Sequence, residues 1–175
     1  MTKILIFSDL HGDKDALALL IDKIKMEKPT TLINVGDFGL FMLGRDFDKL
    51  KNLSIPLLNV QGNCDSRWEF NKKKLQAPPI YITKELNDRK IVATHGDLYY
   101  DWKLFPLYLD AKDIFVSGHT HVAHLYQNSS GPILLNPGSV SSPRDNNEPS
   151  YAIIDENEIV IKTLFNSIVL KSLKI

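Results

Sequence analysis

The order of apolar segments over the first 65 residues constrains the fold more than any other feature of the chain. Residues 3–7 (KILIF) form a short apolar run, as expected for a strand that is buried on both faces. Between residues 14 and 28, leucine and isoleucine recur at the i, i+3, i+4 and i+7 spacing of a helix, and Pro29 helps to end this segment. The next predicted elements are a strand at 31–35, a short helix at 45–53 and a strand at 55–60. This β-α-β-α-β order predicts a parallel sheet with right-handed crossovers, and such sheets bind ligands beyond the carboxyl ends of their strands.

The second half of the chain has shorter apolar runs that are separated by turn-like segments. Residues 87–88 predict one hairpin turn and residues 155–158 a second, terminal hairpin. Trp102–Leu109 is predicted as a short helix that Pro106 weakens. The predicted strands lie at 80–83, 90–94, 114–117, 123–127, 133–136, 151–154 and 159–163. We therefore expect an α/β fold in one domain over residues 1–175, in which a parallel part and a more antiparallel part form two packed sheets with helices outside.

Polar residues follow the apolar runs at the points where the predicted strands end. Four of the five histidines stand at such positions; the remaining one, His124, is interpreted as an ordinary strand residue. Asp9/His11 and His119/His121 have i, i+2 spacing, which points both side chains of each pair the same way in extended backbone. We therefore expect the strand ends to converge on one centre. The segments concerned are Asp9-Leu10-His11, Gly36-Asp37, Gly62-Asn63-Cys64-Asp65, His95-Gly96-Asp97 and Gly118-His119-Thr120-His121.

The combined set of donors predicts a metal centre. Four imidazoles, two carboxylates and one carboxamide are too many ligands for one ion and suit two. Mixed nitrogen and oxygen ligands favour Mn, Fe, Zn or Co over Mg or Ca, and Asp37, in the middle of the set, is the natural bridge between two ions. Taken singly, a histidine after a strand is more often a surface or core residue, and a Gly-Asp pair is more often a turn. Their joint occurrence at five strand ends favours the metal centre.

These motifs resemble those of a known family, the calcineurin-like metallophosphoesterases. They occur in the family's order and span most of the chain. The small size of the chain, GNCD, THGD, GHTH and the segment Asn136-Pro137-Gly138-Ser139 are most similar to the small bacterial and archaeal phosphodiesterase branch. That branch shares its fold with a eukaryotic retromer scaffold subunit. The motifs are D-x-H (Asp9, His11), G-D (Gly36, Asp37), G-N-x-D (Gly62 to Asp65), the lone His95 and G-H-x-H (Gly118 to His121).

The resemblance implies a fold, a reaction and a role for each ligand. The fold would be a four-layer α/β/β/α sandwich of two mixed β-sheets flanked by helices. The cofactors would be two divalent transition-metal ions, with Mn²⁺ favoured and Zn²⁺, Fe or Ni²⁺ as alternatives. The reaction would be hydrolysis of a phosphoric ester, most simply a diester, by a hydroxide that bridges the ions. The implied ligands are Asp9, His11 and His121 for the first ion, Asp37 for both, and Asn63, His95 and His119 for the second.

The chain departs from the family pattern at Cys64. In the wider family a histidine follows the motif asparagine, is held by the acid after it, and is assigned the protonation of the leaving group. A nucleophilic Cys64 would lack a free base, and a ligating Cys64 would add a soft thiolate to a complete set. We favour a third interpretation, in which Cys64 is a weak donor or a passive side chain near the substrate, beside the ligand Asn63. This interpretation predicts a preference for esters with good leaving groups. The next residue, Asp65, either orients the loop or forms an Asx-type turn.

Four apolar side chains lie close in sequence to these motif loops. Either they form an apolar rim beside the metals, or they are core or dimer contacts. The four are Phe38, Phe41, Met42 and Trp68.

Composition limits the classes of partner and compartment. Lys and Arg number 21 and so do Asp and Glu, so no bulk attraction to nucleic acid or to an anionic membrane is expected. No apolar run approaches the roughly 20 residues that a membrane-spanning helix needs. A single cysteine, and an acidic residue too early in the chain for a secretory signal, favour a cytoplasmic protein. The resemblance implies a small phosphodiester substrate, and homo-oligomerisation stays open. The alternative function is a non-catalytic metal-binding scaffold or interaction protein on the same fold, although every ligand position keeps a competent residue.

Overall fold

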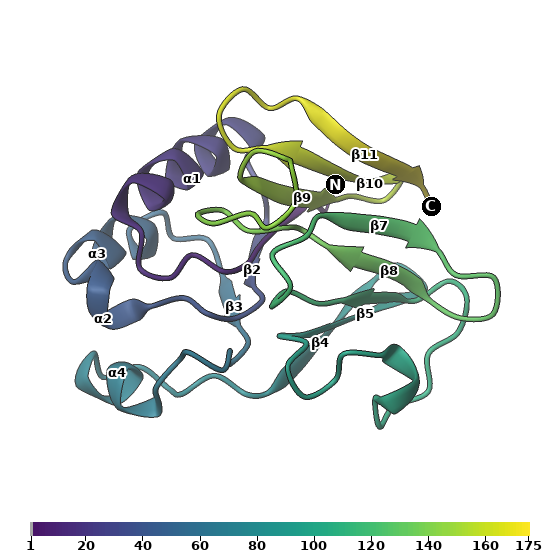
Figure 1. Ribbon diagram of the computed structural model, residues 1–175, viewed down its shortest axis with the longest axis horizontal. Helices are drawn as coiled ribbons and strands as arrows, with labels where there is room; N and C mark the ends of the chain where they lie inside the picture. Colours follow the sequence, from purple (N-terminus) through teal and green to yellow (C-terminus); the bar gives the residue numbers. More distant parts are fainter. Residues whose placement is uncertain (1) are drawn as a thin grey trace.

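A computed structural model describes residues 2–175 and shows two mixed β-sheets flanked by few helices (Figure 1). The four-layer α/β/β/α fold class expected from the resemblance is therefore confirmed. The helices are α1 (Lys14–Glu27), α2 (Leu40–Leu43), α3 (Asp46–Lys51) and α4 (Arg67–Lys72), with one 3₁₀ turn, η1 (Trp102–Leu104). The strands are β1 (Ile4–Phe7), β2 (Thr31–Asn34), β3 (Leu57–Asn59), β4 (Tyr81–Leu86), β5 (Arg89–Thr94), β6 (Ile114–Val116), β7 (His124–Gln127), β8 (Ile133–Asn136), β9 (Ser150–Ile154), β10 (Glu158–Thr163) and β11 (Val169–Lys174).

The first sheet has the strand order β11-β10-β9-β1-β2-β3. Strands β1, β2 and β3 pair in parallel, as the β-α-β-α-β pattern predicts. The predicted terminal hairpin exists as β9 and β10, but β11 follows it, so the hairpin does not end the chain. The hairpin joins the first sheet and not the second, because β9 pairs antiparallel with the edge of β1 that β2 leaves free. Sequence patterns describe single strands, so they do not reveal this return of the chain to its first strand.

The second sheet has the order β4-β5-β6-β8-β7. Its outer pairs, β4 with β5 and β7 with β8, are antiparallel hairpins, as predicted. Its inner pairs, β5 with β6 and β6 with β8, are parallel. The expected antiparallel character therefore holds only at the edges of this sheet. The parallel centre makes the carboxyl ends of β5 and β6 point the same way.

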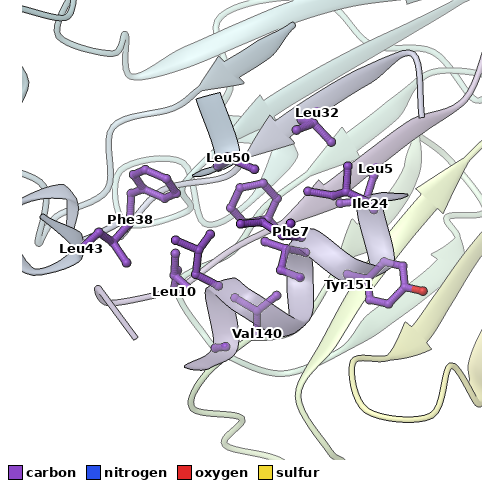
Figure 2. Packing of buried hydrophobic residues seen from close by; sticks show 14 of the residues in the cluster. Leu5, Phe7, Leu10, Ile24, Leu32, Phe38, Leu43, Leu50, Val140 and Tyr151 are labelled. Carbon is purple, nitrogen blue, oxygen red and sulfur yellow. The ribbon is translucent and has the colours of Figure 1, made fainter. Parts of the chain in front are cut away.

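Helix α1 shows why the helices gather on one side of the molecule. Asp13 caps its start, since the Asp13 side chain accepts hydrogen bonds from the amides of Asp15 and Ala16, and Lys28 ends it in left-handed backbone. One face of α1 packs on Leu5 and Phe7 of β1, in a cluster that Figure 2 shows from close by. Helices α2 and α4 were missed in the sequence because each is very short. No helix between residues 2 and 175 is long and apolar enough to cross a membrane.

The outer face of the second sheet is covered mainly by irregular chain. The predicted helix 102–109 is reduced to the three residues of η1. Phe105, which precedes Pro106, is forced into extended backbone (φ −74°, ψ 138°), and this ends the turn. Phe105 and Leu109 still pack on Val92 and Phe115 of the sheet. The fourth layer of the sandwich is therefore a loop with one short turn, held by apolar contacts.

The layer between the two sheets holds the molecule together. Ile4, Ile6 and Ile33 of the first sheet meet Val116 and Leu135 of the second in one buried cluster, and all five are at most 1% exposed. Such burial contributes about 25 cal/mol for each Å² of apolar surface removed from water. The cluster fixes one sheet against the other and so fixes the distance between their strand ends.

Glu27, the last residue of α1, ties this helix to the first sheet. Its carboxylate accepts a hydrogen bond from the Tyr151 hydroxyl (3.2 Å) and pairs with Lys162 Nζ (2.7 Å) and Lys3 Nζ (3.4 Å). Burial by itself would raise the pKa of Glu27, but the two lysines outweigh burial and lower it. The charged carboxylate is therefore stabilised in the folded protein.

We expect Glu27→Gln to lower the free energy of unfolding by about 1–3 kcal/mol near neutral pH, measured by urea denaturation, because it removes the charge that faces Lys162. A carboxyl whose folded pKa is depressed stabilises the fold above its unfolded pKa, and this contribution is lost as pH falls through the folded pKa. The difference between the two proteins should therefore shrink below about pH 4.3. The control is Glu148→Gln at an exposed carboxylate. A loss that is equally large in acid would contradict the assignment.

Candidate metal centre

The predicted ligand residues lie on the loops that follow five strands of the two sheets. Asp9 and His11 follow β1, Asp37 follows β2 and Asn63 follows β3, all in the first sheet. His95 follows β5 and His119 and His121 follow β6, in the second sheet. Close distances cross from one sheet to the other, since His11 Nε2 lies 3.2 Å from His121 Nε2 and His95 Nε2 lies 3.4 Å from Asp37 Oδ2. The expected convergence at one edge therefore occurs, and it involves both sheets.

One group of donor atoms is formed by Asp9, His11 and His121. Asp9 is fully buried, and its Oδ1 lies 3.2 Å from His121 Nε2 and 3.9 Å from His11 Nε2. The three side chains offer donor atoms that lie within 4.8 Å of one another. This is the set that the resemblance implies for the first ion.

A second group surrounds His95 and overlaps the first, since Asp9, Asp37 and His95 also offer donor atoms within 4.8 Å of one another. His95 Nε2 lies 3.4 Å from Asp37 Oδ2 and 3.1 Å from Asn63 Oδ1. The same Asp37 oxygen lies 3.8 Å from His11 Nε2, which belongs to the first group. Asp37 therefore lies close to donor atoms of both groups.

His119 lies next to the second group but is set back from it. Its ring centroid is 5.1 Å from that of His95, while its backbone amide donates to Asp9 Oδ2 at 3.1 Å. The compact sets of donor atoms found within residues 2–175 do not include its ring. His124 lies away from both groups on β7, where burial and then Lys171 lower its pKa. His124 is thus placed as the ordinary strand residue that was expected.

The backbone that presents these ligands is not extended, and the reasoning from i, i+2 spacing was wrong on this point. Five of the predicted ligands have a positive φ, between 49° and 63°. Left-handed backbone costs free energy for residues with a Cβ, although Asp and His tolerate it better than most. The paired side chains converge because the chain turns sharply at each ligand. These residues are Asp9, His11, Asp37, His119 and His121.

Two backbone carbonyls fix the orientation of the buried imidazoles. His95 Nδ1 donates to the carbonyl of Val35 (2.8 Å), and His121 Nδ1 donates to the carbonyl of Ser142 (2.6 Å). A carbonyl can only accept, so Nδ1 carries a proton, and Nε2 is the ring nitrogen that faces the ligand groups. Sequence analysis missed both partners because a backbone carbonyl has no side-chain signature.

The segment Asn136-Pro137-Gly138-Ser139 supports the ligand loops through hydrogen bonds. Asn136 Nδ2 donates to the Gly118 carbonyl (2.8 Å), and Ser139 Oγ donates to the Asp9 carbonyl (2.8 Å). Ser141 Oγ, which the sequence did not single out, donates to the same Asp9 carbonyl (2.8 Å). These bonds hold Asp9 and the GHTH loop in their strained conformations.

Asp65 orients the loops and does not belong to the ligand groups. Its carboxylate accepts hydrogen bonds from the amides of Phe38 (2.8 Å), Gly39 (3.3 Å) and Gly62 (3.0 Å). It thereby fastens the loop after β3 to the loop that carries Asp37. A side chain at Gly62 would collide with Asp37, which explains why glycine is needed there.

The donor groups fit metal ions. Asp9 Oδ1 is buried without a hydrogen-bond partner, although two imidazole nitrogens face it. Burial by itself would raise the pKa of Asp37, but hydrogen bonds from His95 and from the Cys64 amide outweigh burial and lower it. Burial opposes a charge on His95, but the hydrogen bond to Asp37 helps to raise the pKa of His95 to about 9. A site that turns carboxylate oxygens and the Nε2 atoms of several imidazoles toward one another suits cations, which take the place of the Nε2 protons.

Cys64 is exposed beside the second group. Its amide donates to Asp37 Oδ1 (2.8 Å), and its Sγ accepts from Asn63 Nδ2 (3.3 Å). Burial of the sulfur and the nearby carboxylates, Asp37 above all, raise the pKa of the Cys64 thiol to about 11. Without a metal ion beside it, the thiol is therefore protonated at neutral pH, which argues against a nucleophile. Its Sγ also lies within 4.8 Å of donor atoms of His11 and Asp37, so geometry alone does not separate Cys64 from the ligand groups.

The four apolar residues near the motif loops divide into two classes. Phe38 is fully buried and packs on Phe7 and Phe47, so it is a core residue (Figure 2). Phe41, Met42 and Trp68 are each more than half exposed. The rings of Phe41 and Trp68 lie 5.5 Å apart, so α2 and α4 share an exposed apolar rim.

Comparisons with known proteins agree with this geometry. A family model described as the calcineurin-like phosphoesterase superfamily domain matches residues 2–158. The chain is 27% identical to phosphodiesterase YfcE of Escherichia coli K12, over 94% of this chain and 93% of that protein. It is 30% identical to the probable metallophosphoesterase YsnB of Bacillus subtilis, over 86% of this chain and 82% of that protein.

Solved structures share the fold at lower identity. YfcE from E. coli, described as a phosphoesterase, matches with a TM-score of 0.83 at 23% identity over 98% of each chain. Vps29 from Entamoeba histolytica matches with a TM-score of 0.69 at 22% identity, over 99% of this chain and 98% of that chain. Both matches show the same architecture along nearly the whole chain.

We expect Mn²⁺ to stabilise the protein against heat, because a cation pairs with the buried Asp9 oxygen and separates the facing imidazoles. At a hundredfold excess over Kd, one site adds about 2.7 kcal/mol to the free energy of unfolding, which raises Tm by several degrees. Scanning calorimetry should show this rise, its reversal by EDTA, and a much smaller rise in Asp9→Asn. Asp97→Asn, at an exposed carboxylate outside the donor groups, is the matched control. Equal rises in both variants would argue against the site.

Proposed function

The chain belongs to the calcineurin-like phosphoesterase superfamily, and on this premise we propose that it is a phosphodiesterase with a dinuclear metal centre. The observation that carries the proposal is the position of Asp37, whose Oδ2 lies 3.4 Å from His95 and 3.8 Å from His11. One carboxylate between two groups of donors suits a pair of ions better than one. The phosphodiesterase name of the E. coli relative, at 27% identity, supports a diester as the substrate.

The proposed ligand assignment follows the two groups of donor atoms. Asp9, His11 and His121 hold one ion, and Asn63 and His95 hold the other, with Asp37 shared between them. His119 completes the second set through a small movement of its ring, which already lies beside that of His95. Mn²⁺ is the favoured metal, because the set is rich in both imidazole and carboxylate donors.

The residues of the chain prepare a site for an anionic ester. When bound, two divalent ions would supply Lewis acidity for the phosphoryl oxygens and an activated water as the nucleophile. The backbone carbonyls of Val35 and Ser142 keep the Nε2 atoms of His95 and His121 aimed at the centre. Asp65 holds the Asn63 loop against the Asp37 loop, so both ligands of the second group keep their positions.

Cys64 limits the leaving groups that the site can expel. Its protonated thiol stands at the exposed position beside Asn63, where the wider family has a histidine. A thiol donates only a weak hydrogen bond, so it helps a departing alkoxide less than an imidazolium does. We therefore propose that the chain prefers diesters with acidic leaving groups, or diesters whose leaving group takes its proton from water.

The alternative is a scaffold on the same fold, and the fold match to Vps29 gives it a specific basis. A scaffold needs only its surface, and it gains nothing from donor atoms that crowd together behind left-handed backbone. This chain has a donor residue at each predicted ligand position, and hydrogen bonds to backbone carbonyls orient the imidazoles of His95 and His121. The enzyme is therefore the better-supported reading.

We expect the protein to hydrolyse bis(p-nitrophenyl) phosphate in the presence of Mn²⁺. The rate is measured from the absorbance of the nitrophenolate that is released. EDTA should abolish it, and Asp37→Ala should lower kcat/KM by at least about a thousandfold, since the shared carboxylate belongs to both ion sites. Asp97→Asn should retain the wild-type rate. A folded protein that binds Mn²⁺ and turns over none of a panel of phosphodiesters would support the scaffold instead.

The role of Cys64 gives a separate prediction. Cys64→His should raise kcat/KM for alkyl diesters by about tenfold or more, because general acids contribute about 10²–10⁴-fold where the leaving group is poor. The rate for nitrophenyl esters should change little, and Cys64→Ala should leave it near wild type. No gain on alkyl esters in a metal-loaded Cys64→His protein would remove the main support for this account.

A further inference from the structure

The apolar rim of Phe41, Met42 and Trp68 lies beside the predicted metal ligands. Its two helices follow ligand loops directly, since α2 begins three residues after Asp37 and α4 begins four residues after Asn63. Four residues span at most about 14 Å even when fully extended. Large apolar side chains that are more than half exposed and lie together mark a binding surface. The position of this surface favours a partner that reaches the metal centre.

Contacts within the described chain hold the rim close to His11 and Cys64. A side chain at Gly12 would collide with Met42, so Met42 lies against the residue that follows His11. His11 in turn offers a donor atom within 4.8 Å of Cys64 Sγ. The rim therefore borders the position beside Cys64, where the proposed reaction expels its leaving group.

Two aromatic rings form the larger part of the rim. The ring centroids of Phe41 and Trp68 lie 5.5 Å apart and the ring planes are inclined by 46°, so the rings do not cover each other face to face. The Phe41 amide donates to Glu69 Oε2 (2.8 Å), which joins α2 to α4 and fixes the spacing of the two rings. Lys72 Nζ lies 5.3 Å from the centroid of the Trp68 ring, so a cation stands next to it. Such a surface suits a planar aromatic group that is attached to an anion.

The rim and Cys64 make compatible demands on the leaving group. The Cys64 thiol donates only a weak hydrogen bond, so the leaving oxygen has to carry negative charge with little help. A phenol does this better than an alkyl alcohol, because its ring delocalises the charge. A nucleobase could also contact the rim, but it is joined to phosphorus through a sugar, whose alkoxide is a poor leaving group. A phenol therefore meets both demands with one group.

We propose that Phe41 and Trp68 determine specificity by binding an aromatic leaving group, so that the substrate is a diester of phosphoric acid with a phenol. This inference rests on the proposed function. One water molecule is consumed: its hydroxyl goes to phosphorus, the bond from phosphorus to the aryl oxygen breaks with its electron pair on that oxygen, and a proton from water ends on the phenolate. Phe41 and Trp68 take no part in bond breaking, so they act on KM more than on kcat.

The test compares two diesters whose leaving groups have similar acidity but different shape, methyl phenyl phosphate and methyl hexafluoroisopropyl phosphate. Their ratio of kcat/KM, measured from the release of methyl phosphate with Mn²⁺ present, gives the preference for the ring. Trp68→Ala and Phe41→Ala should each lower this preference at least about fivefold, the lower end of what one stacked ring contributes. An unchanged preference in both folded variants would overturn the inference.

Two further variants serve as controls. Trp68→Phe keeps an aromatic ring on the rim, so it should keep most of the preference. Tyr108→Ala removes a ring that is 84% exposed on the loop over the second sheet, so it should keep the whole preference. An equal loss in Tyr108→Ala would count against a specific role for the rim.

A binding measurement separates this inference from the proposed function. Phenylphosphonate and ethylphosphonate carry the same anionic group and have no ester bond to break. Titrated into the ¹⁵N-labelled full chain with diamagnetic Zn²⁺, phenylphosphonate should shift the indole N–H signal that Trp68→Ala lacks, and should bind at least about fivefold more tightly than ethylphosphonate. Equal affinities would overturn the inference even in an active phosphodiesterase. Binding of phenylphosphonate at Trp68 by a protein that hydrolyses no ester would support the aromatic contact and overturn the proposed function instead.

A second copy of the chain is the competing occupant of the rim. Sedimentation should give the same mass for the wild-type protein and for Trp68→Ala. A dimer that Trp68→Ala splits into monomers, together with an unchanged preference for the phenyl ester, would overturn the inference and assign the rim to an interface between copies.

Discussion

The packing of the two sheets face to face is the constraint on which the metal centre depends. Ile4, Ile6 and Ile33 meet Val116 and Leu135 in the buried layer between the sheets, and three of the strands concerned, β1, β2 and β6, end at ligand loops. The donor atoms of His11 and His121 come from different sheets and still lie 3.2 Å apart. A shift of one sheet by a few ångströms would separate the two halves of each ligand group. The apolar core therefore determines the geometry of the polar site, because close-packed interiors resist such shifts.

The ligand loops carry a cost that the rest of the structure offsets. Asp9, Asp37 and His121 hold left-handed backbone, and Asp9 also buries an oxygen with no hydrogen-bond partner. Such features persist only where surrounding contacts fix them. Here the contacts are side-chain hydrogen bonds from Ser139 and Ser141 to the Asp9 carbonyl, and the Asp65 carboxylate across three amides. Bound cations would offset the cost of this backbone, because they coordinate the clustered oxygens and imidazole nitrogens.

The positions of most strands and of the ligand residues could be predicted from the sequence, because local patterns determine strands and strand ends. The apolar run at 3–7 indicates β1, and Asp9 and His11 directly after it indicate ligands at its carboxyl end. Strand order could not be predicted, because nothing in residues 150–154 says that β9 pairs with β1. Ligand backbone was wrongly expected to be extended, since tertiary hydrogen bonds impose the left-handed turns. Imidazole orientation stayed hidden because it rests on the carbonyls of Val35 and Ser142, which any residue could supply.

In the proposed function, the predicted metal ligands and the Cys64 thiol serve different steps of the reaction. Nucleophile generation and charge stabilisation depend on the ligands, and each predicted ligand position keeps its donor. Leaving-group protonation depends on the position of Cys64, where nearby carboxylates, after burial itself, raise the thiol pKa to about 11. The negative charge of the carboxylates favours cations at the centre, and the same charge helps to keep the Cys64 thiol protonated and uncharged. A histidine there would gain charge from the same carboxylates, so in the proposed reaction the cysteine stands where a general acid could act and leaves the predicted metal ligands in place. In the proposed reaction, selectivity among leaving groups therefore depends on one side chain, whereas attack on phosphorus depends on the two sheets that carry the predicted ligands.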